Sequence, residues 1–281
     1  MSKENLDLYS KNEIIVMRAR LLTLMTSAKC GAGHLTSSLS IIEILVALYS
    51  KKYSSEKDQD NIRIVLSKGH AALAVYSVLV EFDRISAPEF LNYNKNNALL
   101  TSHTNRKLIP EVELSTGSLG MGLGFGAGLA LGQKIGMTAG KTFVILGDGE
   151  CNEGSVWEAA MFAVANGLSN LVAIVDSNKV QAVARSSELL AESAILDAFG
   201  AFGWDVVTIN GHSLSEIEKA INIQSNRPLL IFANTVSGKS IELFENDVQW
   251  HYRNPVWREV EEYISETNAD LYGQDLIEMF Q

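Results

Sequence analysis

The chain has 281 residues, of which 47% are hydrophobic and 20% charged, and its formal net charge is −10 at pH 7. This length allows one large domain or two small ones with an ample core. The acidic balance argues against nucleic acid and anionic membranes as partners, since both require a basic surface. It leaves a phosphorylated small molecule open, because a metal ion and backbone N–H groups can bind phosphate without a basic surface.

The cysteines and the amino terminus indicate the compartment. Cys30 and Cys151 form neither a disulfide framework nor a zinc-binding spacing. The first residues, MSKENLDLYSKNE, are polar and lack a signal-peptide core or a transit-peptide pattern. The most apolar run, 120–131, is rich in glycine and too short to span a bilayer. We therefore expect a cytoplasmic protein that has no membrane partner.

Short β-branched runs alternate along the chain with segments of helical spacing. Strands are predicted at RIVL (63–66), TFVIL (142–146), LVAIV (171–175), DVVTI (205–209) and LLIFA (229–233). Helices are predicted at 11–28, 40–50, 70–82, 118–135, 154–166, 192–202 and 213–223. Apolar strands separated by helices indicate an α/β fold, a parallel β-sheet with helices on both faces. Right-handed crossovers then place all carboxyl ends of the strands at one edge, where such sheets bind ligands.

Two further segments complete the chain. Residues 84–116 have little periodicity and are rich in Asn, Ser and Thr, which predicts an ordered loop region over the ligand-binding edge. The pattern VWREVEEYI after Pro255 predicts a helix that packs on the body or on a partner. No linker, low-complexity tract or internal repeat is evident, so we expect a single domain over residues 1–281.

Polar side chains follow two successive strands of the predicted sheet. Gly147-Asp148-Gly149 comes directly after TFVIL, and Asn178 follows LVAIV. Neighbouring parallel strands would therefore bring a carboxylate and an amide oxygen to one place. Hard oxygen ligands of this kind, few enough to leave room for phosphate oxygens, suit Mg²⁺. Read alone, the first motif is also compatible with a simple tight turn.

Glycines and histidines mark the other candidate positions. The stretch STGSLGMGLGFGAGLALG (115–132) is a poor helix composition, which favours close packing against another backbone or a flat cofactor. Close packing within its own domain explains the stretch equally well. Three histidines lie in unusual local sequences: GAGHLTSS (His34), LSKGHAAL (His70) and LTSHTN (His103). Imidazole is the side chain best suited to proton transfer near neutral pH, so several at one edge suggest catalysis.

These motifs resemble the transketolase family. GDGECNEGSVWEAAMFAVANGLSNLVAIVDSNKVQ is similar to its thiamine diphosphate motif, and GHLTSS, LSKGHAA and STGSLGMGL match in the same order. The resemblance covers roughly residues 12–255. It implies the thiamine-diphosphate-binding fold, thiamine diphosphate with Mg²⁺ (or Ca²⁺) as cofactors, and transfer of a two-carbon ketol unit from a ketose to an aldose.

The resemblance also implies a role for individual residues. Asp148 and Asn178 would bind the metal through their side chains and Val180 through its carbonyl, while the Gly149 backbone would contact the diphosphate. The expected cofactor-binding set is His70, Gly117, Leu119, Gly147, Asp148, Gly149, Glu150, Asn178, Val180 and Val236. The expected catalytic set is His34, His70, His103 and His251.

Two acidic residues and one histidine complete the comparison. Glu153 and Glu158 resemble interface residues that link paired sites in the family, although solvated helix charges explain them as well. His212, in INGHS, matches a loop position without an assigned catalytic role.

The resemblance implies that half of the active site lies elsewhere. Transketolases carry a pyrimidine-binding domain, which supplies the glutamate that activates the cofactor, and a C-terminal domain. Both are absent from residues 1–281. We therefore expect the N-terminal subunit of a split transketolase, paired with a separate pyrimidine-domain chain in an α₂β₂ heterotetramer.

Some positions depart from the family pattern. Leu35 follows His34 where proline is common, Ile109-Pro110-Glu111 replaces a Pro-Gly pair, and Tyr252-Arg253-Asn254 follows His251 where a small residue is common. A bulkier and more basic lip suggests an unusual acceptor, such as a modified or nucleotide-linked sugar.

Two alternative functions stay open at this stage. One is another thiamine enzyme component, similar to deoxyxylulose-phosphate synthase or to the α subunit of a 2-oxo acid dehydrogenase. LSKGH and STGSLG favour the transketolase branch over the dehydrogenase. The other is a non-catalytic protein that binds thiamine diphosphate.

Overall fold

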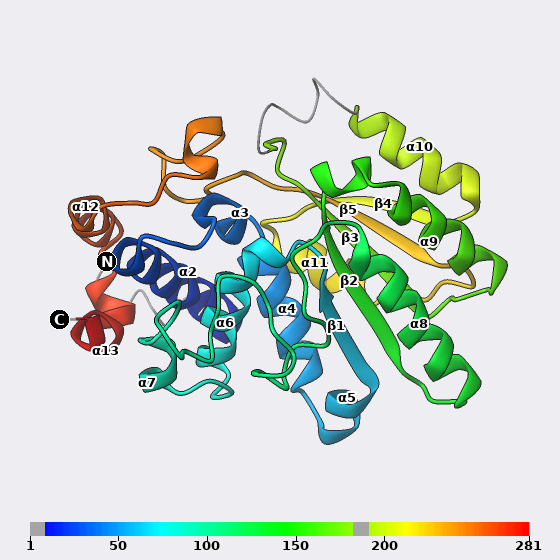
Figure 1. Ribbon diagram of the computed structural model, residues 1–281, viewed down its shortest axis with the longest axis horizontal. Helices are drawn as coiled ribbons and strands as arrows, with labels where there is room; N and C mark the ends of the chain where they lie inside the picture. Colours follow the sequence, from blue (N-terminus) through cyan, green and yellow to red (C-terminus); the bar gives the residue numbers. More distant parts are fainter. Residues whose placement is uncertain (1–8, 182–190, 281) are drawn as a thin grey trace.

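The computed structural model describes residues 9–181 and 191–280, and its centre is one parallel sheet (Figure 1). The amino-terminal residues for which the sequence predicts no targeting signal lie partly outside this range. The strands are β1 (Ile62–Leu66), β2 (Lys141–Gly147), β3 (Leu171–Ser177), β4 (Asp205–Asn210) and β5 (Leu229–Asn234). Their order in the sheet is β1-β2-β3-β5-β4, and every pairing is parallel. The predicted α/β fold and its strands are confirmed.

The helices lie between the strands, as expected. Those predicted from periodicity are α2 (Lys11–Cys30), α4 (Ile42–Lys52), α6 (Ala72–Glu81), α8 (Met121–Ile135), α9 (Gly154–Ala165), α10 (Glu192–Phe202) and α11 (Leu214–Ile221). The pattern after Pro255 becomes α12 (Trp257–Thr267). Among the described residues, four helices lack a sequence prediction: α3 (Leu35–Leu39), α5 (Glu56–Asn61), α7 (Ala87–Phe90) and α13 (Asp270–Phe280). Three of them are too short to show a period, and Gly273 interrupts the fourth with non-helical backbone angles.

Each face of the sheet carries its own helical layer. In β2, Phe143 and Ile145 pack into one buried cluster together with α2, α4 and α6. Val144 and Leu146 point the other way and pack against α8, α9 and α10. Successive side chains of a strand face opposite sides, so a run that is apolar throughout must be covered on both.

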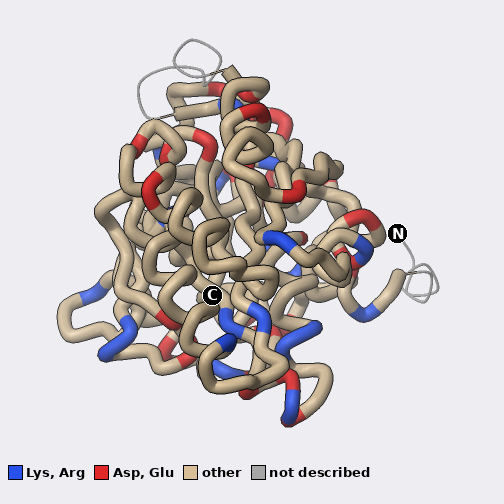
Figure 2. Tube along the Cα trace, turned by 90° about the vertical axis from the view of Figure 1, so that its right-hand side faces the viewer, with Lys and Arg blue, Asp and Glu red and all other residues tan. Residues whose placement is uncertain are grey.

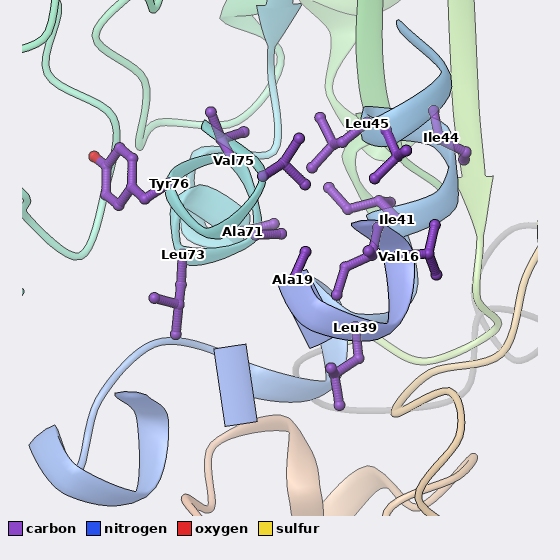
Figure 3. Packing of buried hydrophobic residues seen from close by; sticks show 14 of the residues in the cluster. Val16, Ala19, Leu39, Ile41, Ile44, Leu45, Ala71, Leu73, Val75 and Tyr76 are labelled. Carbon is purple, nitrogen blue, oxygen red and sulfur yellow. The ribbon is translucent and has the colours of Figure 1, made fainter. Parts of the chain in front are cut away.

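Helix α2 is the centre of the larger layer. It begins with a capping box, in which Ser10 and Glu13 bond each other's backbone N–H. Figure 3 shows Val16 and Ala19 of α2 packed toward side chains of α4 and α6. The tail helices α12 and α13 both contact α2. The predicted tail helix therefore packs on the body of the chain.

The segment 84–116 forms the predicted ordered loop region. Phe90, Tyr93 and Leu100 are its buried anchors. Glu113 lies near Arg63 (3.3 Å) and Arg106 (3.5 Å), which ties the end of the segment to β1. The hydroxyl of Tyr76 in α6 donates to the carbonyl of His103 (3.1 Å). These contacts fix the loop that carries His103 beside the carboxyl ends of the strands.

Charged residues of both signs are spread along the chain. Figure 2 shows Lys and Arg interspersed with Asp and Glu along the face that it draws. Within residues 9–181 and 191–280, no helix combines the length and the apolarity needed to cross a membrane.

Candidate active site

A cavity of about 280 Å³ lies where β1, β2 and β3 end. It brings together nearly all the predicted site residues: His34, His70, His103, Gly117, Leu119, Gly147, Asp148, Gly149, Glu150, Asn178, Val180 and His251. These residues come from segments that are far apart in the sequence. They meet because the carboxyl ends of parallel strands share one edge of the sheet.

The predicted metal ligands follow neighbouring strands in register. Gly147 at the end of β2 pairs with Asp176 in β3, so the residues just beyond each strand are adjacent. The Asp148 carboxylate accepts the backbone N–H groups of Gly149 (2.7 Å) and Lys179 (3.1 Å). Asn178 donates through Nδ2 to Asp176 (3.0 Å), which fixes its amide so that Oδ1 faces the Val180 N–H (3.1 Å).

The described residues contain no group of three His, Cys, Asp or Glu side chains able to hold a metal ion. The predicted set is of another kind, since it combines one carboxylate, one amide and one backbone carbonyl. Such a set provides the hard oxygen ligands that Mg²⁺ and Ca²⁺ prefer. The donor chemistry therefore fits a divalent cation accompanied by phosphate oxygens.

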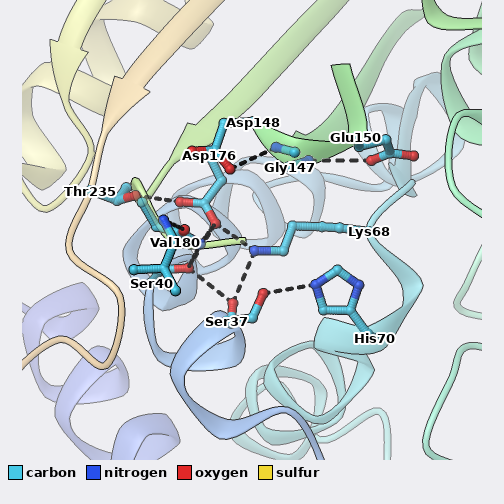
Figure 4. Close-up of polar contacts among 12 residues, drawn as sticks. Ser37, Ser40, Lys68, His70, Gly147, Asp148, Glu150, Asp176, Val180 and Thr235 are labelled. Atoms are coloured by element: carbon cyan, nitrogen blue, oxygen red, sulfur yellow. Dashed lines mark hydrogen bonds and ion pairs between the residues drawn. The ribbon is translucent and has the colours of Figure 1, made fainter. Parts of the chain in front are cut away.

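A buried ion pair lies behind these ligands (Figure 4). Lys68 Nζ lies 2.5 Å from Asp176 Oδ2, and the two side chains are 1% and 0% exposed. Asp176 also accepts hydrogen bonds from Ser40 (2.7 Å), Thr235 and Asn178. A buried ion pair is stabilising only when its remaining hydrogen-bonding capacity is met, and these donors meet it. The pair thus holds Asn178 in place.

Glu150 is a second carboxylate that is held by hydrogen bonds within this chain. It accepts hydrogen bonds from the Gly120 N–H (2.7 Å), the Gly147 N–H (3.2 Å) and the Ser67 hydroxyl (2.5 Å). Burial raises the pKa of Glu150, and these hydrogen bonds act in the opposite direction. Glu150 lines the cavity, but its carboxylate binds the start of α8 to the ends of β1 and β2.

The glycine-rich stretch divides between two roles. A Cβ on Gly122 would lie 2.3 Å from Ser67, and one on Gly126 would lie 2.3 Å from Val144, so α8 packs closely on its own sheet. Gly117 instead lines the cavity, next to the ring of His103. Close packing within the domain is therefore confirmed for Gly122 and Gly126, whereas contact of Gly117 with a cofactor stays a prediction.

Four histidines surround the other end of the cavity. His34 is at their centre, with ring centroids 5.2 Å from His70, 6.2 Å from His103 and 5.8 Å from His251. Ser37 Oγ lies 2.9 Å from His70 Nε2 and fixes that ring. The predicted catalytic histidines therefore form one cluster.

The cluster favours neutral imidazoles. Burial lowers the pKa of His70 to about 2, with the nearby Lys68 cation acting in the same direction. Burial, with a contribution from His34, lowers the pKa of His251 to about 4. Burial and His103 also lower the pKa of His34. Each neutral ring offers one N–H donor and one acceptor, which suits sugar hydroxyls and proton transfer.

His34 has an unusual backbone conformation. Its φ is 21° and its ψ is 60°, at the start of α3. Residues other than glycine rarely adopt positive φ, and such strain costs of order 1–3 kcal/mol. The preceding Gly33 packs tightly, since a Cβ there would lie 2.9 Å from Leu73. The sequence GAGH thus directs one imidazole into the middle of the cluster.

The predicted bulky lip lies only partly at the cavity. Tyr252 lines it, with its ring 5.7 Å from that of His34. Arg253 instead lies over the ring of Trp250 (4.1 Å) and near Glu259 (3.4 Å). The aromatic residue therefore contacts the site, whereas the basic one packs on the neighbouring 3-10 turn and α12. An unusual acceptor stays a prediction.

Four other residues lie outside the cavity lining. Glu153 and Glu158 are exposed, and Glu158 lines a separate hollow between α8 and α9. Val236 follows β5, and its N–H donates to His212 Nε2 (2.9 Å). The expected contact of Val236 with a cofactor and the expected interface role of the two glutamates stay predictions.

Several residues that line or support the site were not predicted from the sequence. Ser37, Lys68 and Gln181 line the cavity, and Asp176 supports it from behind. All four lie inside motifs already noted, at GHLTSS, LSKGH, VDSN and NKVQ. Lys68, two positions before the cavity histidine His70, was the available signal. Its partner could not be identified, because Asp176 is more than a hundred positions away.

Comparisons with known proteins show the family of the chain. The family described as "Transketolase, thiamine diphosphate binding domain" matches residues 11–263. One subunit of the apulose-4-phosphate transketolase of Phocaeicola vulgatus is 34% identical, over 96% of each chain. A "6-deoxy-6-sulfo-D-fructose transketolase subunit SqwG" of Clostridium sp. is also 34% identical, over 89% of this chain and 92% of that one.

The fold agrees as well. A crystal structure of transketolase from Campylobacter jejuni superimposes with a TM-score of 0.76 at 23% identity, covering 95% of this chain and 50% of that one. The chain thus spans about half the length of this solved enzyme. The family match covers most of the chain, and the resemblance read from the motifs is confirmed. The chain belongs to the transketolase family and matches its thiamine diphosphate binding domain.

Proposed function

We propose that this chain is the N-terminal subunit of a split transketolase. With a separate subunit, it would transfer a two-carbon ketol unit from a ketose to an aldose acceptor. The observation that carries the proposal is a single cavity, with the predicted metal and diphosphate ligands at one end and four histidines at the other. Two relatives of similar length that are named as transketolase subunits support it.

The cofactors are thiamine diphosphate and a divalent cation, Mg²⁺ or Ca²⁺. Asp148 and Asn178 would hold the cation with the Val180 carbonyl, and the Gly149 backbone would contact the diphosphate. Gln181 Nε2, on the same wall, is buried and makes no hydrogen bond with the described residues, as a donor awaiting an anion would be. When bound, thiamine diphosphate supplies the electron sink for carbon–carbon bond cleavage.

The histidines would handle the substrate. As neutral rings they can donate to and accept from the hydroxyl groups of a sugar, and they can carry protons near the reacting carbon. His70 is held by Ser37, so its ring has one orientation toward the cavity. The names of both relatives designate sugars that carry an anionic group, which supports an anionic sugar derivative as substrate.

A catalytic carboxylic acid would come from the partner. Among the described residues that line the cavity, Asp148 and Glu150 are the only carboxylates. Asp148 is assigned to the cation, and Glu150 is committed to three hydrogen bonds within this chain. We therefore assign residues 1–281 to a single diphosphate-binding domain. The pyrimidine-binding domain with its glutamate, and the C-terminal domain, would lie on the partner subunit.

An apolar face supports the assembly. Met121 and Phe125 of α8 and Met161 and Phe162 of α9 are exposed on two helices that contact each other. Exposed apolar patches of this kind mark protein interaction surfaces. We place the contacts of an α₂β₂ heterotetramer here, with Glu158 at the edge. Both cysteines are free thiols, which supports the cytoplasm as the location.

Isolation of the complex tests this proposal. The tagged chain is purified from its native host with thiamine diphosphate and Mg²⁺, and co-purifying proteins are identified by mass spectrometry. We expect a stoichiometric partner with a pyrimidine-binding domain. The complex should transfer ketol units between sugars, and pyruvate should not release CO₂.

Two outcomes would contradict the proposal. CO₂ release from pyruvate would favour a synthase-like or dehydrogenase-like enzyme. Cofactor binding without turnover in the presence of the partner would favour a non-catalytic binding protein.

A further inference from the structure

The motif Asn210-Gly211-His212 begins at the last residue of β4 and does not reach the cavity. His212 is the one histidine of the five in the chain that does not line it. The backbone around His212 nevertheless makes specific hydrogen bonds. The Asn210 side chain accepts the His212 N–H (3.0 Å), and the Gly211 N–H donates to the carbonyl of Asn234 (2.8 Å).

Glycine allows this loop to approach the residues after β5. A Cβ on Gly211 would lie 2.4 Å from the Thr235 side chain and 3.2 Å from that of Ala233. Any larger residue would therefore push the loop away. The close approach brings the His212 ring against the backbone of Val236.

The hydrogen bond of the ring determines its tautomer. His212 Nε2 lies 2.9 Å from the Val236 backbone nitrogen, whose N–H can only donate. Nε2 must therefore carry a lone pair, and the single ring proton must be on Nδ1. Nδ1 lies 3.3 Å from Glu43 Oε2, with side-chain exposures of 11% and 8%. Neither atom makes another hydrogen bond within residues 9–181 and 191–280.

Glu43 is held as a carboxylate. Its other oxygen accepts a hydrogen bond from buried Arg20 (2.6 Å). Burial alone would raise the pKa of Glu43, but the Arg20 cation and His212 outweigh this effect and lower it. An ionised Glu43 favours the Nδ1–H tautomer. A chain of contacts thus runs from α2 through α4 and the loop after β4 to Val236.

Residues 235–238, here called the β5 extension, contact residues that support both ends of the cavity. The Thr235 hydroxyl donates to Asp176, which orients Asn178. The Gly238 N–H donates to the carbonyl of Thr36 (3.0 Å) in α3, the helix that follows His34 and contains Ser37. A shift of this extension would therefore move the metal ligands and the histidine cluster together.

We infer that His212 is a positioning residue for this site. As a neutral Nδ1–H imidazole held by Glu43 and Arg20, it fixes the β5 extension in the conformation that binds thiamine diphosphate and Mg²⁺. The inference rests on the proposed function for the identity of the ligand. The tautomer and its contacts are properties of the chain itself.

Nitrogen-15 NMR of the histidine rings tests the tautomer in the full-length chain. We expect one ring with a protonated Nδ1 and an unprotonated, hydrogen-bonded Nε2 at pH 7, and its signals should vanish in His212→Gln. A ring of His212 that carries its proton on Nε2 would overturn the inference. This result does not depend on any ligand.

Calorimetric titration of the complex with its partner subunit, with thiamine diphosphate in Mg²⁺, tests the positioning. His212→Asn is too short to reach Val236 and leaves its N–H unpaired, so we expect about tenfold weaker binding. His212→Gln is longer by one methylene and places an amide oxygen within reach, so we expect binding within about threefold of the wild type.

The two variants differ only in reach, which makes each the control for the other. Wild-type affinity in His212→Asn, or equally weak binding in both variants, would overturn the inference. A complex of the wild-type chain with its partner that does not bind thiamine diphosphate would instead contradict the proposed function. The NMR result would then still report on the tautomer.

Discussion

The two ends of the cavity differ in how far their ionisable side chains are already hydrogen-bonded. At the end with the predicted metal ligands, Asp176 is bonded by Lys68, Ser40, Thr235 and Asn178, and Glu150 has three donors. The amide Nε2 of Gln181 is a buried donor at this end without a partner among the described residues. At the histidine end, Nδ1 of His34 is buried without a hydrogen-bond partner among the described residues. A group of fixed shape, such as a diphosphate, suits a rigid site. Variable sugar hydroxyls suit rings whose donors and acceptors are still available.

The largest effect on stability is expected when the buried ion pair between Lys68 and Asp176 is removed. Lys68→Met leaves the Asp176 carboxylate buried without its cation, so we expect the free energy of unfolding to fall by about 3–5 kcal/mol. Urea denaturation measures the change. Lys239→Met is the control, because that lysine pairs with Glu245 at the surface and should cost less than about 0.5 kcal/mol. Equal losses in both variants would show that the buried pair is not special.

Substitutions at the histidine end of the cavity should affect turnover rather than stability. His34→Asn removes the imidazole but keeps a residue type that tolerates positive φ. In the complex with its partner, we expect kcat/KM to fall by about 100-fold, the lower range for a lost proton-transfer group. The urea midpoint should hardly change. A large stability loss with normal turnover would reverse the distinction between the two ends.

The predicted metal ligand Asp148 should give a smaller but selective effect. Asp148→Asn removes the only carboxylate of the predicted set, and we expect at least about tenfold weaker binding of thiamine diphosphate in Mg²⁺. Calorimetry measures the affinity. Glu261→Gln, an exposed carboxylate of α12 outside the cavity lining, should bind as the wild type does. Unchanged affinity in Asp148→Asn would remove this residue from the metal site.

The smallest effect concerns pH. Burial lowers the pKa of His251 to about 4 and of His70 to about 2, below the value of about 6.5 for an unfolded histidine. The unfolded chain therefore binds more protons below pH 6.5, and the free energy of unfolding should fall as the pH drops from 6.5 toward 4. Above pH 7 these two groups should contribute no pH dependence.

Urea midpoints at pH 7, 6 and 5 measure the slope. His70→Gln removes one of the two groups, so its slope should be shallower than that of the wild type. Identical slopes would assign the acid sensitivity to other residues.

The sequence predicts the parts of the site that follow from strand geometry. Asp148 and Asn178 could be placed together because each follows an apolar strand, and parallel neighbours end at one edge. The histidine cluster followed from unusual local sequences, and the transketolase motifs then assigned the roles. The strands were predictable for the same reason, since buried parallel strands are apolar on both faces.

The supporting contacts could not be predicted, because they depend on packing between distant segments. Lys68 meets Asp176, and His212 meets both Glu43 and Val236, only after the sheet and two helical layers have formed. No local pattern distinguishes these residues from surface charges or a loop histidine. Helices α3, α5 and α7 were not predicted, because one or two helical turns are too short to show a hydrophobic period.

The strand order has a consequence for folding kinetics. β2 and β3 pair Thr142 with Leu171, a separation of roughly 30 residues, whereas β1 pairs Ile62 with Lys141 over roughly 80. Closing the longer loop costs more entropy, so β1 should join the sheet late. Lys68 lies just beyond β1, and its contact with Asp176 should therefore be absent from the folding transition state. Replacing it should accelerate unfolding while leaving the folding rate nearly unchanged.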